Sequence, residues 1–150
     1  MDRYHIFLAC PFETCETDGH RFPFYEKLAH TLESFEKRLF LPHKELLGLK
    51  YPAQVADIAI SRAELVLCDT GIPSCAAGIM LQTAFDRHKP VISFRNLDDP
   101  YDGINDRILE RALNAHRSKR LSYCRDEDGL STIVGAIREL YGPTIPGWTN

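Results

Sequence analysis

The sequence lacks long hydrophobic runs and has no excess of positive charge. Its longest apolar stretches fall far short of the roughly 20 residues that span a bilayer, and the first residues, MDRYHIFLAC, pass directly into a strand pattern instead of a signal segment. Lys and Arg number 18 against 21 Asp and Glu, which gives a formal net charge of −3. We therefore expect a cytoplasmic protein whose partners include neither a membrane nor a nucleic acid polymer.

Cysteine forms no paired motif, and histidine is scattered. The five cysteines are odd in number and form no CxxC pair, which favours a reduced compartment. Cys68 and Cys124 lie in strand patterns and are predicted to be buried. Six histidines show no ligand spacing, so we expect neither a metal nor another cofactor. Cys75 stands at a predicted helix N-terminus, where a thiol could be reactive, but no histidine lies near it in the sequence to form a catalytic pair.

The usual nucleotide-binding fingerprints are also missing. The chain has no GxxxxGK[ST] motif, and no GxGxxG follows its first predicted strand. With 150 residues and 44% hydrophobic content, it is predicted to form one globular domain over residues 1–150.

Short apolar segments alternate with helical patterns along the whole chain. The predicted strands are 4–9, 39–41, 65–68, 90–94 and 120–124. The predicted helices begin near Pro23 and after Ser74 and also cover 51–62, 104–113 and 129–141. This alternation indicates an α/β fold, a flavodoxin-like or Rossmann-like doubly wound and mainly parallel sheet of five strands in the order 2-1-3-4-5.

The stretch 64–94 predicts a strand-helix-strand unit that positions a binding site. Its first strand ends at Asp69, and the chain then turns through Gly71 and Pro73 to Ser74. Open α/β sheets bind ligands beyond the carboxyl ends of their strands. In the predicted order, the loop after Ala9 and the turn after Cys68 face each other across one crevice.

The first wall of this crevice comes from Cys10, Pro11 and Phe12. Backbone amides could approach a ligand there, and the Phe12 ring could stack on a nucleobase or a sugar. Alternatively, Pro11 ends the strand and Phe12 packs on the core.

The second wall comes from Asp69 and the helix that follows it. Asp69 could accept hydrogen bonds from sugar hydroxyls or act as an acid or base, or it could cap the turn 71–74. Ser74 precedes the small residues Cys75-Ala76-Ala77-Gly78, so the helix N-terminus is suited to a phosphate. Alternatively, Ser74 is an ordinary N-cap.

Two segments resemble the nucleoside 2-deoxyribosyltransferase-like superfamily. They are the opening IFLACPF and the central AELVLCDTGIPSCAAGIMLQTAFDRHKPVISF, in which an acid, a Pro-Ser turn, a glycine, a helix and a KPV strand follow in order. That superfamily includes deoxyribosyltransferases and nucleotide N-glycosidases, which cleave the bond between a base and its sugar. The resemblance also implies a homo-oligomer.

The resemblance implies a role for several positions. Ala9, Pro11 and Phe12 would line the base and sugar pocket, while Ser74 and the amides of Cys75–Gly78, Ala76 among them, would hold a 5′-phosphate or 5′-hydroxyl. A nucleophilic glutamate is expected two residues after Gly78.

Met80 stands at that position instead, and a thioether can neither form a glycosyl ester nor stabilise positive charge as a carboxylate would. Asp57 lies nearest the family's second acid, on the helix before the third strand. Asp69, Glu13 or Glu16 could replace the missing glutamate.

Three hypotheses follow. The first is a transferase or hydrolase that acts on the N-glycosidic bond of a nucleoside or nucleotide, with Asp69 as its catalytic acid. The second is an inactive nucleotide-binding module of the same fold. The third is an interaction protein that uses its apolar tail, 141–148.

Overall fold

The computed structural model describes residues 4–11, 21–71, 75–98 and 118–141. They form a five-stranded parallel sheet in the order β2-β1-β3-β4-β5. The predicted doubly wound α/β fold and its strand order are therefore confirmed. Phe12, Ser74, the acids Glu13 and Glu16, the predicted helix 104–113 and the tail after Tyr141 lie outside the described residues.

The strands and helices alternate along the chain. The strands are β1 (Ile6–Ala9), β2 (Leu39–Phe40), β3 (Leu65–Asp69), β4 (Val91–Asn96) and β5 (Ser118–Tyr123). The helices are α2 (Phe22–Glu33), α3 (Pro42–Glu45), α4 (Pro52–Arg62), α5 (Cys75–Asp86) and α7 (Asp126–Tyr141). No described helix combines the length and the hydrophobicity that crossing a bilayer requires.

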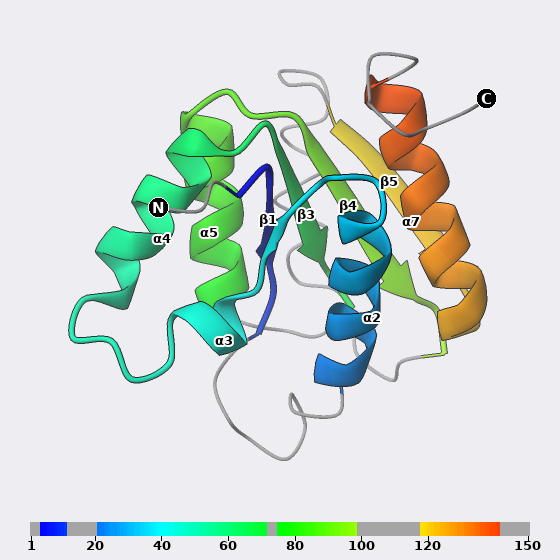
Figure 1. Ribbon diagram of the computed structural model, residues 1–150, viewed down its shortest axis with the longest axis horizontal. Coiled ribbons are helices and arrows are strands. Elements are labelled where there is room, and N and C mark those ends of the chain that lie inside the picture. The colour runs from blue at the N-terminus through cyan, green and yellow to red at the C-terminus, as the bar shows by residue number, and fades with distance from the viewer. Residues whose placement is uncertain (1–3, 12–20, 72–74, 99–117, 142–150) are drawn as a thin grey trace.

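The sheet is covered by helices on both faces, as Figure 1 shows. Alternate residues of β1 face opposite layers: Ile6 and Leu8 pack with α2 and α7, whereas Phe7 and Ala9 pack with α4 and α5. All residues of β1 and β3 are buried. This double cover explains why both strands read as continuous apolar runs in the sequence.

Proline marks the start of three helices. Pro23, Pro42 and Pro52 lie in the first turns of α2, α3 and α4, where the missing amide hydrogen removes no helical hydrogen bond. The start of α2 places its first turn at the carboxyl edge of the sheet, where β1 and β3 end (Figure 1).

The edge strand β5 differs from its prediction. It begins at Ser118 and ends at Tyr123, and most of its residues are half-buried or exposed. Cys68 is buried in β3 as predicted, but Cys124 is exposed, so the prediction of its burial is wrong. The physical reason is that Cys124 follows the outermost strand of the described sheet, where fewer neighbours cover a side chain.

Candidate functional site at the carboxyl edge

The structure places the described residues of the first predicted wall, Cys10 and Pro11, beside Asp69 of the second. β1 and β3 are neighbours in the sheet, and Ala9 pairs with Cys68. Cys10 and Asp69, the next residues of the two strands, therefore both lie at the carboxyl edge. Ala9, Cys10 and Asp69 are all 0% exposed, and Pro11 is also buried.

Asp69 is held by hydrogen bonds from two side chains and the backbone. Tyr25 Oη donates to Asp69 Oδ2 over 2.6 Å, and Arg21 Nε lies 3.4 Å from the same oxygen. The amide of Gly71 donates to Asp69 Oδ1 over 2.9 Å. A carboxylate has about four acceptor positions, which leaves roughly one on Oδ1.

Both side-chain donors come from the beginning of α2. Arg21 and Tyr25 are four residues apart and therefore share one face of the helix. Beyond its contact with Asp69, Arg21 donates through Nη2 to Tyr123 Oη over 3.3 Å and through Nη1 to Asp126 Oδ1 over 3.2 Å. A single guanidinium group thus joins two carboxylates from different elements.

Asp126 is the solvent-facing member of this group. It is the first residue of α7, and 49% of its side chain is exposed. Asn96, at the end of β4, donates through Nδ2 to Asp126 Oδ1 over 3.1 Å and accepts from the amide of Asp98 over 2.9 Å. We use the name carboxyl-edge cluster for six residues: Arg21, Tyr25, Asp69, Asn96, Tyr123 and Asp126.

The environment fixes the protonation of the donors in the cluster. Burial, with the nearby charge of Asp69 as the next cause, raises the pKa of Tyr25 well above its ordinary value, and the same two causes raise the pKa of Tyr123. Burial alone would lower the pKa of Arg21, but the charge of Asp69 and the two tyrosines raise it overall. At neutral pH, both phenols therefore keep their protons and the guanidinium keeps its charge.

The predicted binding residues on α5 lie on the other face of the sheet. Ala76 and Gly78 are half-buried in the first turns of this helix. Met80 is 5% exposed and packs in the core layer that includes Phe7, Ala9 and Leu81. Its thioether is therefore part of the packing between α5 and the sheet.

Asp57 does not join the carboxyl-edge cluster. It lies on α4, which covers the face opposite α2, and its carboxylate receives two hydrogen bonds from Arg87 Nη2, at 3.0 and 2.9 Å. Arg87 directly follows the C-terminal end of α5. The structure therefore assigns Asp57 to an ion pair between α4 and α5.

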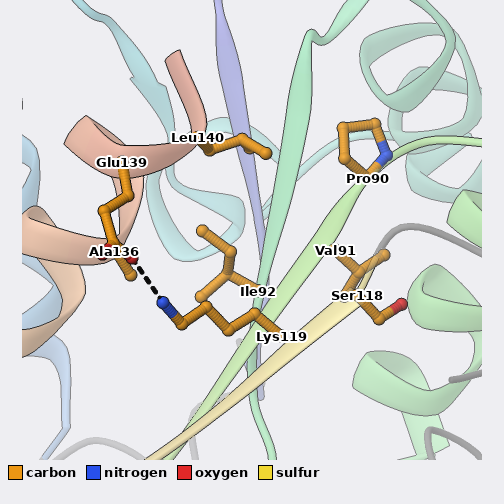
Figure 2. Close-up of a pocket in the computed structure, with 8 residues that line it drawn as sticks. All are labelled: Pro90, Val91, Ile92, Ser118, Lys119, Ala136, Glu139 and Leu140. Atoms are coloured by element: carbon orange, nitrogen blue, oxygen red, sulfur yellow. Dashed lines mark hydrogen bonds and ion pairs between the residues drawn. The ribbon is translucent and has the colours of Figure 1, made fainter. Parts of the chain in front are cut away.

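Two pockets of the described structure lie away from this cluster. One, of about 340 Å³, lies between the beginnings of β4 and β5 and the end of α7, and the ion pair of Lys119 with Glu139 crosses it over 2.6 Å (Figure 2). The other, of about 470 Å³, lies between α2 and Leu130 of α7. Among the described residues, no three His, Cys, Asp or Glu side chains gather into a metal site.

Sequence reasoning selected Asp69 but missed its partners. Asn96 ends β4, and Asp126 follows β5. Asp69 was selected because open α/β sheets bind ligands beyond the carboxyl ends of their strands, and the same rule applies to these two residues. Neither Arg21 nor Tyr25 was selected: Arg21 precedes the predicted helix start near Pro23, and Tyr25 lies inside that predicted helix. Their only signal was a position at the beginning of the helix that follows β1.

The fold is similar to that of known proteins, although the sequence is not. No protein-family model matches the chain, and no characterised protein matches it by sequence. The CMP N-glycosidase BcmB of Clostridium botulinum superimposes with a TM-score of 0.67 at 17% identity, over 88% of this chain and 98% of that one. A conserved protein from Enterococcus faecalis V583 gives a TM-score of 0.57 at 15% identity, over 90% and 99% of the two chains. These likenesses establish the fold.

Proposed function

We propose that the chain binds a nucleoside or nucleotide at the carboxyl edge of its sheet and cleaves the N-glycosidic bond, so that the base leaves and the sugar passes to water or to another acceptor. The observation that carries this proposal is the buried ionic network of Arg21 and Asp69 at the edge where open α/β sheets bind ligands. Burying charged groups costs free energy, and buried groups with raised pKa values, here Tyr25 and Tyr123, are typical of functional sites. The likeness in fold to a CMP N-glycosidase supports the same proposal.

Asp69 is the catalytic carboxylate of the proposed reaction. Breaking a bond between a sugar and its leaving group develops positive charge on the sugar, which a carboxylate stabilises. Tyr25 and Arg21 fix Asp69 Oδ2, so the remaining acceptor position on Oδ1 is the one directed to the ligand. The N-terminus of α5, with Ser74 before it, supplies amides for a 5′-phosphate.

A second function is binding without chemistry, and two observations favour it. Met80 is a core residue at the position where the resemblance expects a nucleophile. Asp69 is 0% exposed and already accepts three hydrogen bonds. A protein of this kind would keep the nucleotide and leave it unchanged.

One experiment separates the two functions. The protein is incubated with a panel of nucleosides and nucleotides, free base is measured by chromatography, and melting temperatures are recorded with the same compounds. We expect at least one compound to release its base and to raise the melting temperature, because a ligand that binds only the folded state stabilises it.

Two variants locate the activity. Asp69→Asn should reduce base release at least about a hundredfold if its charge stabilises the transition state. Asp86→Asn is the matched control, because Asp86 is an exposed acid at the far end of α5. Stabilisation without base release would select the binding function, and no response to any compound would refute both.

A further inference from the structure

Asp126 is the one carboxylate of the carboxyl-edge cluster that reaches solvent. We infer that it is the sugar-recognition group of the site, accepting hydrogen bonds from the 2′- and 3′-hydroxyls of the ligand. This inference rests on the proposed binding of a nucleoside or nucleotide. It adds a specificity-determining residue on α7, far in sequence from the predicted walls of the site.

The hydrogen bonds of Asp126 leave one oxygen available. Arg21 Nη1 and Asn96 Nδ2 both donate to Oδ1, at 3.2 and 3.1 Å. Within the described part of the chain, Oδ2 accepts no hydrogen bond. Since 49% of the Asp126 side chain is exposed, Oδ2 can accept a hydrogen bond from a ligand, whereas the other charged groups of the cluster are buried.

The carboxylate is also held in a fixed orientation. Arg21 is 2% exposed and is anchored by Asp69 and Tyr123. Asn96 is 8% exposed and is anchored by the amide of Asp98. Two buried donors therefore fix Asp126 before any ligand arrives, which reduces the entropy lost on binding.

A helix-dipole role alone does not account for this arrangement. Asp126, Glu127 and Asp128 all lie in the first turn of α7, where acidic residues interact favourably with the helix dipole. Among these three described acids, Asp126 is the one joined to Arg21 and Asn96. Its two neighbours are exposed and therefore serve as natural controls.

The charge of the network selects the part of the ligand that it can bind. One guanidinium shared by two carboxylates leaves a formal charge of −1, which repels a phosphate group. The neighbouring rings of Phe24, Phe94 and Tyr123 are packed into the core and are at most 5% exposed, so they offer no open face to a base. Sugar hydroxyls are neutral donors and match an open carboxylate oxygen.

Binding measurements with sugar-modified ligands test this inference. The probes are cytidine monophosphate, its 2′-deoxy form and its 2′,3′-dideoxy form, and dissociation constants are measured by calorimetry. We expect Asp126→Asn to weaken binding of the ribonucleotide about tenfold or more and to leave binding of the dideoxy form within about twofold, because only the first loses hydrogen bonds to a charged acceptor. Glu127→Gln and Asp128→Asn should bind all three as the wild type does.

Each outcome decides the matter. Equal binding by the wild type and Asp126→Asn overturns the inference, and so does an equal loss for the ribonucleotide and the dideoxy form, which would give Asp126 a purely structural role. Asp126→Ser keeps a good residue for a helix start and repeats the test if the amide variant melts at a lower temperature. Failure of the wild-type protein to bind any nucleotide overturns the proposed function as well, whereas a response limited to other bases moves the same test to those nucleotides.

Discussion

Met80 occupies the position where a nucleophilic glutamate was predicted, but its environment is that of a core residue. The sequence resemblance described above predicts a carboxylate there, but the side chain is 5% exposed and packs with the residues between α5 and the sheet. An apolar, flexible thioether suits such a layer because it fills irregular space without needing a hydrogen-bond partner. We therefore expect Met80 to contribute to the free energy of unfolding.

Met80→Glu tests this environment. We expect the free energy of unfolding to fall by about 3 kcal/mol or more, because an unpaired charge would be buried in an apolar layer. Met80→Leu is the matched control and should cost less than about 1.5 kcal/mol, since it nearly conserves volume. Urea denaturation at neutral pH measures both. Wild-type stability of the glutamate variant would mean that this helix turn opens to water.

At the scale of elements, α7 is shaped by its contact with the carboxyl-edge cluster. Gly129 lies in the first turns of α7 directly over the ring of Tyr123, and a Cβ at this position would overlap that ring. Tyr123 in turn accepts a hydrogen bond from Arg21. The close approach of α7 to β5 therefore depends on glycine and positions a member of the cluster.

The two glycines of α7 give a matched pair of substitutions. Gly135→Ala should raise the free energy of unfolding by about 0.5–1 kcal/mol, because alanine favours helix and no atom lies within 4 Å of the added Cβ. Gly129→Ala should instead lower the free energy of unfolding, because Tyr123 must move, and should weaken the nucleotide binding proposed above. Thermal denaturation and calorimetry measure the two effects. An equal gain in stability from both would contradict the packing of α7 on Tyr123.

At the scale of the whole molecule, one buried histidine makes stability depend on pH. His43 lies on α3 and stacks on the Phe22 ring with centroids 4.1 Å apart. Burial lowers its pKa, although a hydrogen bond with Glu26 opposes the change. When the pH is lowered below the ordinary histidine pKa of about 6.5, the unfolded chain takes up a proton that the folded chain does not. The free energy of unfolding therefore falls as the pH is lowered.

His43→Phe should flatten this dependence. The ring stack is retained while the titrating group is removed, so the free energy of unfolding should fall less between pH 7.5 and 5.5 than it does in the wild type. The pKa of Glu26 is also lowered, chiefly by its hydrogen bond with His43. The stability that this lowered pKa provides is lost only below pH about 4.5, outside the range compared. Urea denaturation at several pH values provides the comparison. Parallel curves for the two proteins would contradict this assignment.

The sequence predicted most of the sheet because its central strands have strong local signals. β1 and β3 are covered on both faces and read as unbroken apolar runs, and the acid at the end of β3 marks the site by its position. β5 was placed less well, because an edge strand is half-exposed and its pattern is weak. The four-residue helix α3 was not predicted, because so short a segment shows little periodicity.

The contacts of Asp69 could not be predicted in the same way. Tyr25 and Arg21 reach it across 44 and 48 positions of the chain, and such meetings depend on how α2 packs on the sheet. Periodicity predicts a helix that contains Tyr25, but it cannot show that the hydroxyl of this residue meets a carboxylate. The sequence therefore predicted the position of Asp69 at the carboxyl edge, whereas its hydrogen-bond partners follow only from the fold.

The contacts of Arg21 have a consequence for the newly made protein. This side chain joins partners that follow it by 48, 102 and 105 positions. A nascent chain therefore cannot complete the network until β5 and the start of α7 have left the ribosome. Fragments that end before Asp126 would lack the acceptor on α7, so the buried guanidinium of Arg21 would miss one of its partners.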